Sequence, residues 1–423
     1  MANDRLDIIV FGATGYTGKF AVQKTAYFCK QENMTFGVAG RRKEALEAVI
    51  KEFAPDSENV PIILADVKDE ESIKKMTEQA KVIVNCCGPY RFYGEPLVKA
   101  CIATGTHHVD VSGEPQYMEK MQLQYNKAAQ EAGVYVVSAC GFDSIPTDLG
   151  IIFTQEKFGG QINSIETYIV LQQAAGVRGP CLNYGTWESA VYGLAHANEL
   201  RELRTKLYPN RLPDLKPKLK SQGMVHRSDI SPGWSMLFLG SDRSVALRSQ
   251  RFLYEKYKER PVQVQTYITV ESFFALLTVS IVGAVFSLLS RTSCGRNLLL
   301  RYPRLFSCGF VSRDGPDAKT LDQMHFSVTL KALGWTEKLA EPTDNHTDPP
   351  NKTVITKVSG DSPAYGMTST ALVLTAVTIL KEKDKMPDNG GVLPPGAAFG
   401  KTSLIEKLNK HGVKFEVISS TEK

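Results

Sequence analysis

Residues 6–18 read LDIIVFGATGYTG, and this stretch decides the fold of the N-terminal part of the chain. Residues 8–11 form an unbroken apolar run, as expected for a strand covered on both faces. Gly12, Gly15 and Gly18 follow at three-residue spacing, which permits a tight turn, close approach of a pyrophosphate and close helix packing. The predicted cofactor contacts in this loop are Gly12, Ala13, Thr14, Gly15, Tyr16 and Thr17.

Apolar runs and stretches of helical length alternate through the first 150 residues. Six strands joined by helical crossovers predict a doubly wound, mostly parallel α/β sheet of the Rossmann type. In that context the glycine loop opens the first helix, whose unpaired N–H groups attract phosphate. We therefore predict a dinucleotide-binding domain over residues 1–150. The expected strands are 6–12, 35–40, 60–66, 82–88, 107–113 and 134–141, and the expected helices include 16–31, 43–53 and 114–131.

The end of the second predicted strand indicates which dinucleotide is bound. An NAD site usually has an acidic residue there, bonded to the ribose hydroxyl. This chain has Arg41 and Arg42 instead. Two guanidiniums suit a 2′-phosphate, so we predict NADP(H) in preference to NAD(H). The alternative is that one arginine stacks on adenine while the other is solvated. Asp66, which ends the third strand, is placed to accept the adenine amino group.

The fourth predicted strand ends at the point where ligands lie in open α/β sheets. Its last residues lead into Cys87, Gly88 and Pro89, and Cys87 and Gly88 are predicted to line the cofactor. Tyr90 is a weak candidate for a catalytic proton donor, because it could face the nicotinamide or the substrate. Cys87 is interpreted as a small buried side chain rather than as a reactive thiol.

Metal ligands are not predicted. His107, His108 and Asp110 resemble a ligand set, but strand alternation places His108 and Asp110 on one face and His107 on the other. A structural histidine is therefore favoured. The net charge of +5 is mild for 423 residues and does not indicate a nucleic-acid partner. The acidic N-terminus differs from a secretory signal peptide, so we do not expect secretion.

The regular alternation of apolar runs with stretches of helical length ends after residue 150. We therefore predict a second α/β domain over 151–351 and a C-terminal segment over 352–423. A charged, proline-containing surface excursion is expected at 204–233, and a polar loop at 340–351. Ser144 is expected to cap the helix that follows the sixth strand. The expected strands are 162–172, 261–270, 324–333 and 353–358, and the expected helices are 187–203, 362–381 and 403–411.

Residues 272–290 lack the charged residues that usually mark the exposed face of a helix in a globular protein. They are 19 consecutive uncharged, mostly apolar residues, close to the roughly 20 that span a bilayer. Arginines and apolar residues alternate from there to residue 306, a pattern suited to a phospholipid surface. We predict association with a membrane or lipid surface through 272–306. A transmembrane span and a shallow insertion both remain open, and the alternative is a buried helix of the second domain or at a homodimer interface.

Five blocks together are similar to the saccharopine dehydrogenase-like oxidoreductases of animals, and the resemblance covers nearly the whole chain. It implies a Rossmann domain, a discontinuous second α/β domain and a C-terminal segment that packs back on the first domain. It also implies association with lipid droplets and cytoplasmic-face membranes, with a mitochondrial location left open. Related bacterial proteins include trans-acting enoyl reductases of mycobacterial glycolipid synthesis. The blocks are GATGYTG, AGRR, NCCGPYRFYGEPLVKAC, HHVDVSGE and GFDSIPTDLG.

Two functions therefore compete. The first is an NADPH-dependent reductase that acts on a lipid-like substrate at a lipid-droplet or membrane surface, in lipid or glycolipid metabolism. The second is a non-catalytic lipid-surface protein that retains a nucleotide-binding fold, since a fold does not prove activity. The motifs supply a cofactor site and no complete catalytic constellation, so the sequence does not decide between the two.

Overall fold

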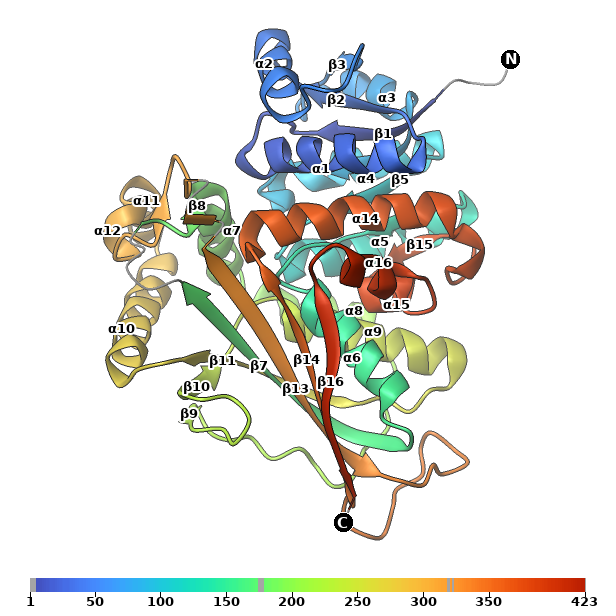
Figure 1. The fold of residues 1–423 in the computed structure, drawn as a ribbon, viewed down its shortest axis with the longest axis vertical. Coiled ribbons are helices and arrows are strands. Elements are labelled where there is room, and N and C mark those ends of the chain that lie inside the picture. Colours follow the sequence, from blue (N-terminus) through green and yellow to red (C-terminus); the bar gives the residue numbers. More distant parts are fainter. Residues whose placement is uncertain (1–4, 174–178, 318–319, 322, 423) are drawn as a thin grey trace.

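A parallel sheet of seven strands carries the N-terminal part of the chain in the computed structural model, which describes residues 5–173, 179–317, 320–321 and 323–422 (Figure 1). The strand order is β15-β6-β5-β4-β1-β2-β3, and every neighbouring pair is parallel. The Rossmann-type sheet is thereby confirmed. The strands are β1 (Leu6–Phe11), β2 (Phe36–Gly40), β3 (Ile62–Leu64), β4 (Ala80–Asn85), β5 (His107–Asp110), β6 (Tyr135–Val137) and β15 (Gly391–Leu393).

Helices connect these strands as crossovers. Every predicted strand of this sheet except β2 ends earlier than expected, because the loop at its carboxyl end begins earlier. The order reverses at β1, which lies between β2 and β4. Ligands of doubly wound sheets bind at such a switch point. The connecting helices are α1 (Tyr16–Glu32), α2 (Lys43–Phe53), α3 (Glu70–Thr77), α4 (Tyr90–Thr104) and α5 (Pro115–Glu131).

A second sheet of seven strands has the order β16-β14-β13-β7-β11-β10-β9. Its strands pair antiparallel except for β7 and β11, which are parallel. A two-stranded parallel sheet of β8 (Leu182–Asn183) and β12 (Val311–Ser312) lies beside it. The large sheet comprises β7 (Gln161–Gln173), β9 (Val225–His226), β10 (Trp234–Leu237), β11 (Gln263–Val270), β13 (Met324–Trp335), β14 (Lys352–Asp361) and β16 (Lys414–Glu422).

The C-terminal segment contributes to both sheets. β14 and β16 lie in the second sheet, whereas β15 pairs with β6 at the edge of the first. Between them, α14 (Thr368–Lys381) lies between the two sheets in Figure 1 and contacts α1, β4 and β5. A single hydrophobic cluster joins Val84 of the first sheet, Leu372 of α14 and Leu330 of the second. The sheets therefore share one core.

The remaining helices surround the second sheet. α6 packs on β13 and β14, and α9 packs on β11. The flank at the left of Figure 1 gathers α10, α11 and α12 beside α7. These helices and the short turns are α6 (Ile145–Lys157), α7 (Tyr184–Ala195), α8 (Glu199–Leu207), α9 (Asp242–Tyr257), α10 (Phe273–Ser290), α11 (Ser293–Arg301), α12 (Pro303–Phe306), η1 (Pro363–Met367), η2 (Lys383–Lys385), α15 (Pro395–Phe399) and α16 (Leu404–Lys410).

Several sequence expectations need correction. The helix expected at 187–203 is two helices, α7 and α8, separated at residues 196–198, and α8 continues into the region expected as a surface excursion. The helix expected at 362–381 begins with the π-helical turn η1. Six strands were not predicted: β8, β9, β10, β12, β15 and β16, of which β9 lies inside the expected surface excursion. The polar loop at 340–351 contains neither helix nor strand, as expected.

Candidate functional site

The glycine loop between β1 and α1 has the shape that its spacing predicts. Gly12 adopts a φ of +76°, and its N–H donates to the carbonyl of Ala39 over 3.1 Å. A Cβ at Gly18 would lie 2.1 Å from the carbonyl oxygen of Gly12, and one at Gly12 would lie 3.0 Å from the carbonyl carbon of Cys86. Each position therefore excludes a side chain, and the loop is held close to both α1 and the β4 strand end.

The start of α1 is open to an anion. Gly15 is the N-cap in extended backbone, and no side chain caps the helix. Thr14 and Gly15 are exposed, whereas Ala13 is buried and donates its N–H to the carbonyl of Ala39. The N–H groups of an uncapped first turn carry a partial positive charge that favours phosphate. Gly12 to Thr17 thus form a cradle that fits a pyrophosphate.

Tyr16 joins this loop to a distant segment. Its hydroxyl donates to the carbonyl of Pro316, and its ring packs edge-on against Tyr365 with centroids 4.5 Å apart. A Cβ at Gly315 would lie 2.4 Å from the Tyr16 ring. Burial raises the pKa of Tyr16 to about 12, so the phenol stays protonated and keeps its hydrogen bond. Residues 315–316 therefore rest directly on the start of α1.

Arg41, Asp66 and Cys87 come together at the carboxyl ends of β2, β3 and β4. Burial raises the pKa of the Cys87 thiol, while the Arg41 charge lowers it and the Asp66 charge raises it. Arg41 and Arg42 are exposed and form no ion pair among the residues described. Two free guanidiniums at the end of β2, with no acid there, fit a phosphate on the adenosine ribose.

The loop after β4 is fixed from within by Asn85. The side-chain oxygen of Asn85 accepts the N–H of Cys87 over 3.0 Å, and its carbonyl accepts the Tyr90 hydroxyl over 3.0 Å. Tyr90 is buried, and burial raises its pKa well above the ordinary value. The phenolic proton of Tyr90 is thus directed at the loop backbone. Gly88 is exposed between these two anchors.

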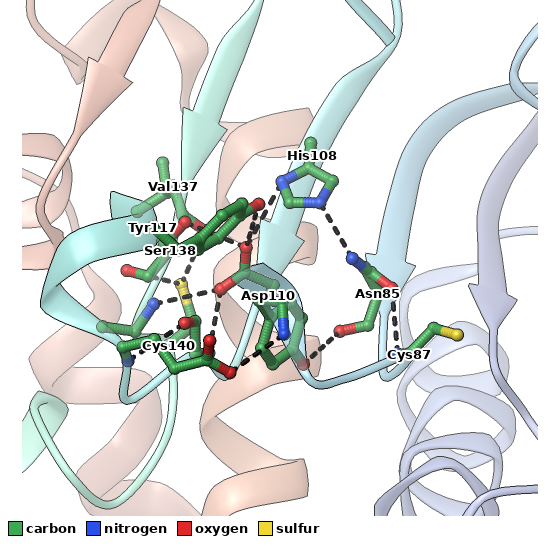
Figure 2. Close-up of polar contacts among 12 residues, drawn as sticks. Asn85, Cys87, His108, Asp110, Tyr117, Val137, Ser138 and Cys140 are labelled. Carbon is green, nitrogen blue, oxygen red and sulfur yellow. Dashed lines mark hydrogen bonds and ion pairs between the residues drawn. The ribbon is translucent and has the colours of Figure 1, made fainter. Parts of the chain in front are cut away.

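A buried polar network continues from Asn85 across the ends of β5 and β6 (Figure 2). The Asn85 amide donates to Nε2 of His108 over 3.3 Å, and Nδ1 of His108 lies 3.8 Å from Oδ2 of Asp110. Tyr117 and Ser138 donate hydroxyls to the same Asp110 oxygen over 3.2 and 2.9 Å. All of these side chains are buried, so the network positions the loop and does not face a substrate.

Burial also sets the protonation of this network. It raises the pKa of Asp110 to about 6, although hydrogen bonds from Ser112 and Ser138 oppose the shift. It lowers the pKa of His108 to about 3, so the imidazole is neutral. The prediction that His108 and Asp110 share a face is correct. No group of three or more His, Cys, Asp or Glu side chains suited to a metal occurs among the residues described.

Glu114 is a functional residue that the sequence reading missed. Its carboxylate accepts the N–H groups of Tyr90 and Arg91, each over 2.9 Å, and the Ser189 hydroxyl over 2.9 Å. A buried carboxylate at a helix N-terminus compensates the partial charge of α4 and fixes its position. In the sequence Glu114 was only the first residue of the expected helix 114–131, and nothing there indicated its contact with α4.

The expected capping role of Ser144 is wrong. Ser144 is the N-cap of α6, but its side chain caps no helical N–H. Its hydroxyl instead donates to the carbonyl of Asp143 over 2.5 Å and lies 3.3 Å from the hydroxyl of Ser241. The backbone of Ser144 adopts φ −156° and ψ −41°, which is outside the extended geometry of a capping residue.

Comparison with known proteins identifies the family of this fold. Residues 8–137 match the family model described as the saccharopine dehydrogenase NADP binding domain. A solved structure of saccharopine dehydrogenase (L-Glu forming) from Saccharomyces cerevisiae superposes with a TM-score of 0.57 at 14% identity, covering 98% of this chain and 100% of that chain. That likeness confirms the fold over the whole length.

Three relatives match along almost their entire length. A human saccharopine dehydrogenase-like oxidoreductase is 39% identical over 98% of both chains, and a Caenorhabditis elegans protein named lipid droplet localized protein is 34% identical over 98% of this chain and 99% of its own. A Mycobacterium tuberculosis protein, whose name gives trans-acting enoyl reductase as its provisional activity, is 28% identical over 97% of both. The chain therefore belongs to the family of saccharopine dehydrogenase-like oxidoreductases, with an NADP-binding domain.

Proposed function

We propose that this protein binds NADP(H) in preference to NAD(H) and uses it to reduce a lipid-like substrate at a lipid-droplet or membrane surface. The observation that carries the cofactor preference is the pair of exposed, unpaired guanidiniums of Arg41 and Arg42 at the end of β2. An arginine can hold a phosphate by two parallel hydrogen bonds, which a ribose hydroxyl cannot reciprocate.

The first test compares NADPH and NADH binding by calorimetry. One charged hydrogen bond contributes about 2 kcal/mol, so Arg41→Ala together with Arg42→Ala should weaken NADPH binding by at least about 30-fold and leave NADH binding nearly unchanged. The matched control is Lys51→Ala, which removes one exposed charge from the far end of α2. Equal loss of both cofactors, or wild-type binding without a preference, would contradict the proposal.

NADPH supplies a hydride when it is bound, and the residues described here hold and shield the place where it acts. Gly12 to Thr17 receive the pyrophosphate, and Cys87 and Gly88 flank the cofactor on the β4 side. Asn85 and Glu114 keep these two residues in position through the loop backbone and the start of α4. A reduction also needs a proton, and water or a backbone N–H beside the bound cofactor is the donor that we favour over the buried Tyr90.

Docking on a lipid surface is supported by α10. In this 18-residue apolar helix only Leu276 and Ser290 are buried, and large side chains such as Phe274 and Leu288 are 79% and 66% exposed. Among the residues that the structure describes, one other helical stretch, Pro363–Lys381, is also long and apolar enough to cross a membrane, but it is mostly buried in the core. An apolar helix exposed on most of its surface fits lipid better than water.

The topology favours a shallow insertion over a span. β11 precedes α10 and β13 follows α12, and both strands pair with β7 in the same sheet. A single crossing between them would place these strands on opposite sides of the membrane. The helix is also tethered at both ends, since Phe273 contacts Trp234 and Phe286 contacts Trp187. We therefore propose that α10 lies along the lipid surface with its outer faces immersed.

The alternative is a non-catalytic lipid-surface protein that retains the nucleotide fold. Purified protein incubated with NADPH and a panel of enoyl and keto lipids in vesicles separates the two, with loss of NADPH absorbance as the readout. Oxidation of NADPH that depends on one lipid class supports the reductase. Saturable NADPH binding with no oxidation across the panel would favour the alternative.

A further inference from the structure

A basic cavity lies next to α10, at the junction of α11, α12 and β12. It has a volume of about 610 Å³. Three guanidiniums, from Arg301, Arg304 and Arg313, line it, together with the single carboxylate of Asp314. Arg301 and Arg304 form no ion pair in the described part of the chain. The three arginines outnumber the two acidic side chains near them, which are Asp314 in the lining and Glu188, whose charge interacts with that of Arg313.

The sequence around the cavity is basic over a long stretch. Residues 272–312 contain four arginines and no aspartate or glutamate. A solvated protein face usually mixes both signs of charge, whereas a one-sided basic stretch beside apolar side chains is suited to anionic phospholipid. This charge pattern does not follow from the overall net charge, which is only +5 for the whole chain.

Exposed apolar side chains surround the mouth of the cavity. Leu305 is 71% exposed, Tyr302 is 45% exposed and Phe310 is 43% exposed. The same flank carries the exposed apolar side chains of α10, which contacts both α11 and α12 (Figure 1). A headgroup entering the cavity would therefore have its acyl chains beside apolar protein surface rather than in water.

One of the three guanidiniums is held in place before any ligand binds. Nη2 of Arg313 donates to the carbonyl of Leu300 over 2.9 Å, and its guanidinium lies 4.3 Å from the centroid of the Tyr184 ring. The carbonyl of Leu300 belongs to the last turn of α11, where backbone acceptors lack helical partners. A fixed guanidinium loses less freedom when it binds a phosphate.

We propose that Arg301, Arg304 and Arg313 form a binding site for the phosphate group of an anionic phospholipid. This proposal rests on the docking of α10 at a lipid surface. The site prefers a phosphate monoester such as that of phosphatidic acid, because such a group presents three oxygens to planar, bidentate donors. The proposed ligand is thus a phospholipid in a membrane surface and not a soluble phosphate ester.

The test is flotation of the full-length protein with three vesicle types: phosphatidylcholine alone, phosphatidylcholine with phosphatidic acid, and phosphatidylcholine with phosphatidylserine at matched surface charge. Two arginines near the surface contribute roughly 30-fold in partitioning. We expect wild-type protein to bind phosphatidic acid vesicles at least 10-fold more tightly than phosphatidylserine vesicles. Arg301→Gln with Arg304→Gln should abolish that ratio.

Arg291→Gln is the matched control, because Arg291 is exposed at the end of α10 and lies outside the cavity lining. It should weaken both anionic vesicle types equally, by about 5-fold, and leave their ratio unchanged. If Arg291→Gln lowers the ratio as much as the double variant does, the charge acts diffusely and the site proposal is wrong. Circular dichroism of each variant checks that its fold is retained.

Two further outcomes separate this site from the docking proposal on which it rests. Wild-type protein that floats equally with all three vesicle types would overturn the phosphate site while leaving docking through α10 intact. Wild-type protein that floats with none would overturn docking itself. Calorimetry with glycerol 3-phosphate in the absence of vesicles tests whether the site binds a soluble phosphate ester. If wild-type protein binds this ester and the double variant does not, the proposal that the ligand is a phospholipid is overturned.

Discussion

The Tyr90 hydroxyl is the residue-scale feature that most affects the interpretation of the candidate cofactor site. It was a candidate proton donor, and that role stays untested. Because the phenol is buried and donates to the Asn85 carbonyl, we expect it to position the β4–α4 loop. Tyr90→Phe should then lower the free energy of unfolding by about 1 kcal/mol, the worth of one buried hydrogen bond.

The same variant distinguishes positioning from catalysis. A positioning role predicts that Tyr90→Phe changes lipid-dependent NADPH oxidation by less than 5-fold, with the effect on KM rather than on kcat. General acid catalysis typically contributes 100-fold or more to the rate. A 100-fold loss of kcat with an unchanged pH optimum for NADPH binding would contradict the positioning role and support Tyr90 as the proton donor.

Asp148 should make the stability of the protein depend on pH, and one substitution tests this. Its Oδ2 accepts the N–H of Gly396 over 2.6 Å and the hydroxyl of Ser249 over 2.7 Å, while Oδ1 has no hydrogen-bond partner in the described chain. Burial raises the pKa of Asp148 to about 6 from 3.8. The stabilising contribution of the protonated acid is therefore complete below pH 3.8 and is lost as the pH rises through 6.

Asp148→Asn keeps an oxygen for both donors and removes the titration. Relative to wild type, we expect the variant to gain about 2 kcal/mol of unfolding free energy between pH 4.5 and 7.5. Urea denaturation of both proteins at the two pH values measures this difference. If the difference in unfolding free energy between variant and wild type is the same at both pH values, Asp148 is not protonated in the native protein near pH 5.

Sequence reasoning at this scale succeeded where backbone geometry dictates the residue type. Gly12 and Gly18 were predictable because a Cβ has no space there. The partners of Glu114 and Ser144 were not predictable, since Ser144 has a local interpretation as a cap and Glu114 was only the start of an expected helix. Glu114 instead reaches across to the N-terminus of α4, a contact that only the folded chain creates.

At the scale of elements, α10 gives a sharp prediction for docking. Burying a large apolar side chain contributes about 2 kcal/mol, so Phe274→Asp should reduce flotation with phosphatidylcholine vesicles by 30-fold or more. The control is Leu123→Asp on α5, which replaces an apolar side chain that is 37% exposed away from this flank. Similar losses for the two variants would contradict docking through α10.

The elements that the sequence did not predict have identifiable physical causes. β15 has only three residues, too few to show any alternation, and its pairing with β6 joins segments some 250 residues apart. β16 is an edge strand that is exposed along most of its length, so apolar residues do not mark it. The long crossover helices and apolar strands of the first sheet, by contrast, carry strong periodic signals.

At the scale of the whole molecule, the shared core predicts cooperative unfolding. Leu372 of α14 belongs to the cluster that contains side chains of both sheets. Calorimetry of the wild-type protein should show one thermal transition, and Leu372→Ala should move that whole transition down, since a buried leucine typically contributes 2–5 kcal/mol. Two separated transitions, with only one of them sensitive to Leu372→Ala, would show that the sheets unfold independently.

The return of the chain into one sheet on either side of α10 has a consequence for where the protein can reside. A helix that enters and leaves from the same side needs only a single leaflet of phospholipid. The monolayer around an oil core and the outer leaflet of a bilayer are then equivalent surfaces for it. The protein could pass from one to the other by lateral diffusion wherever the two are continuous, without moving any polar segment through hydrocarbon.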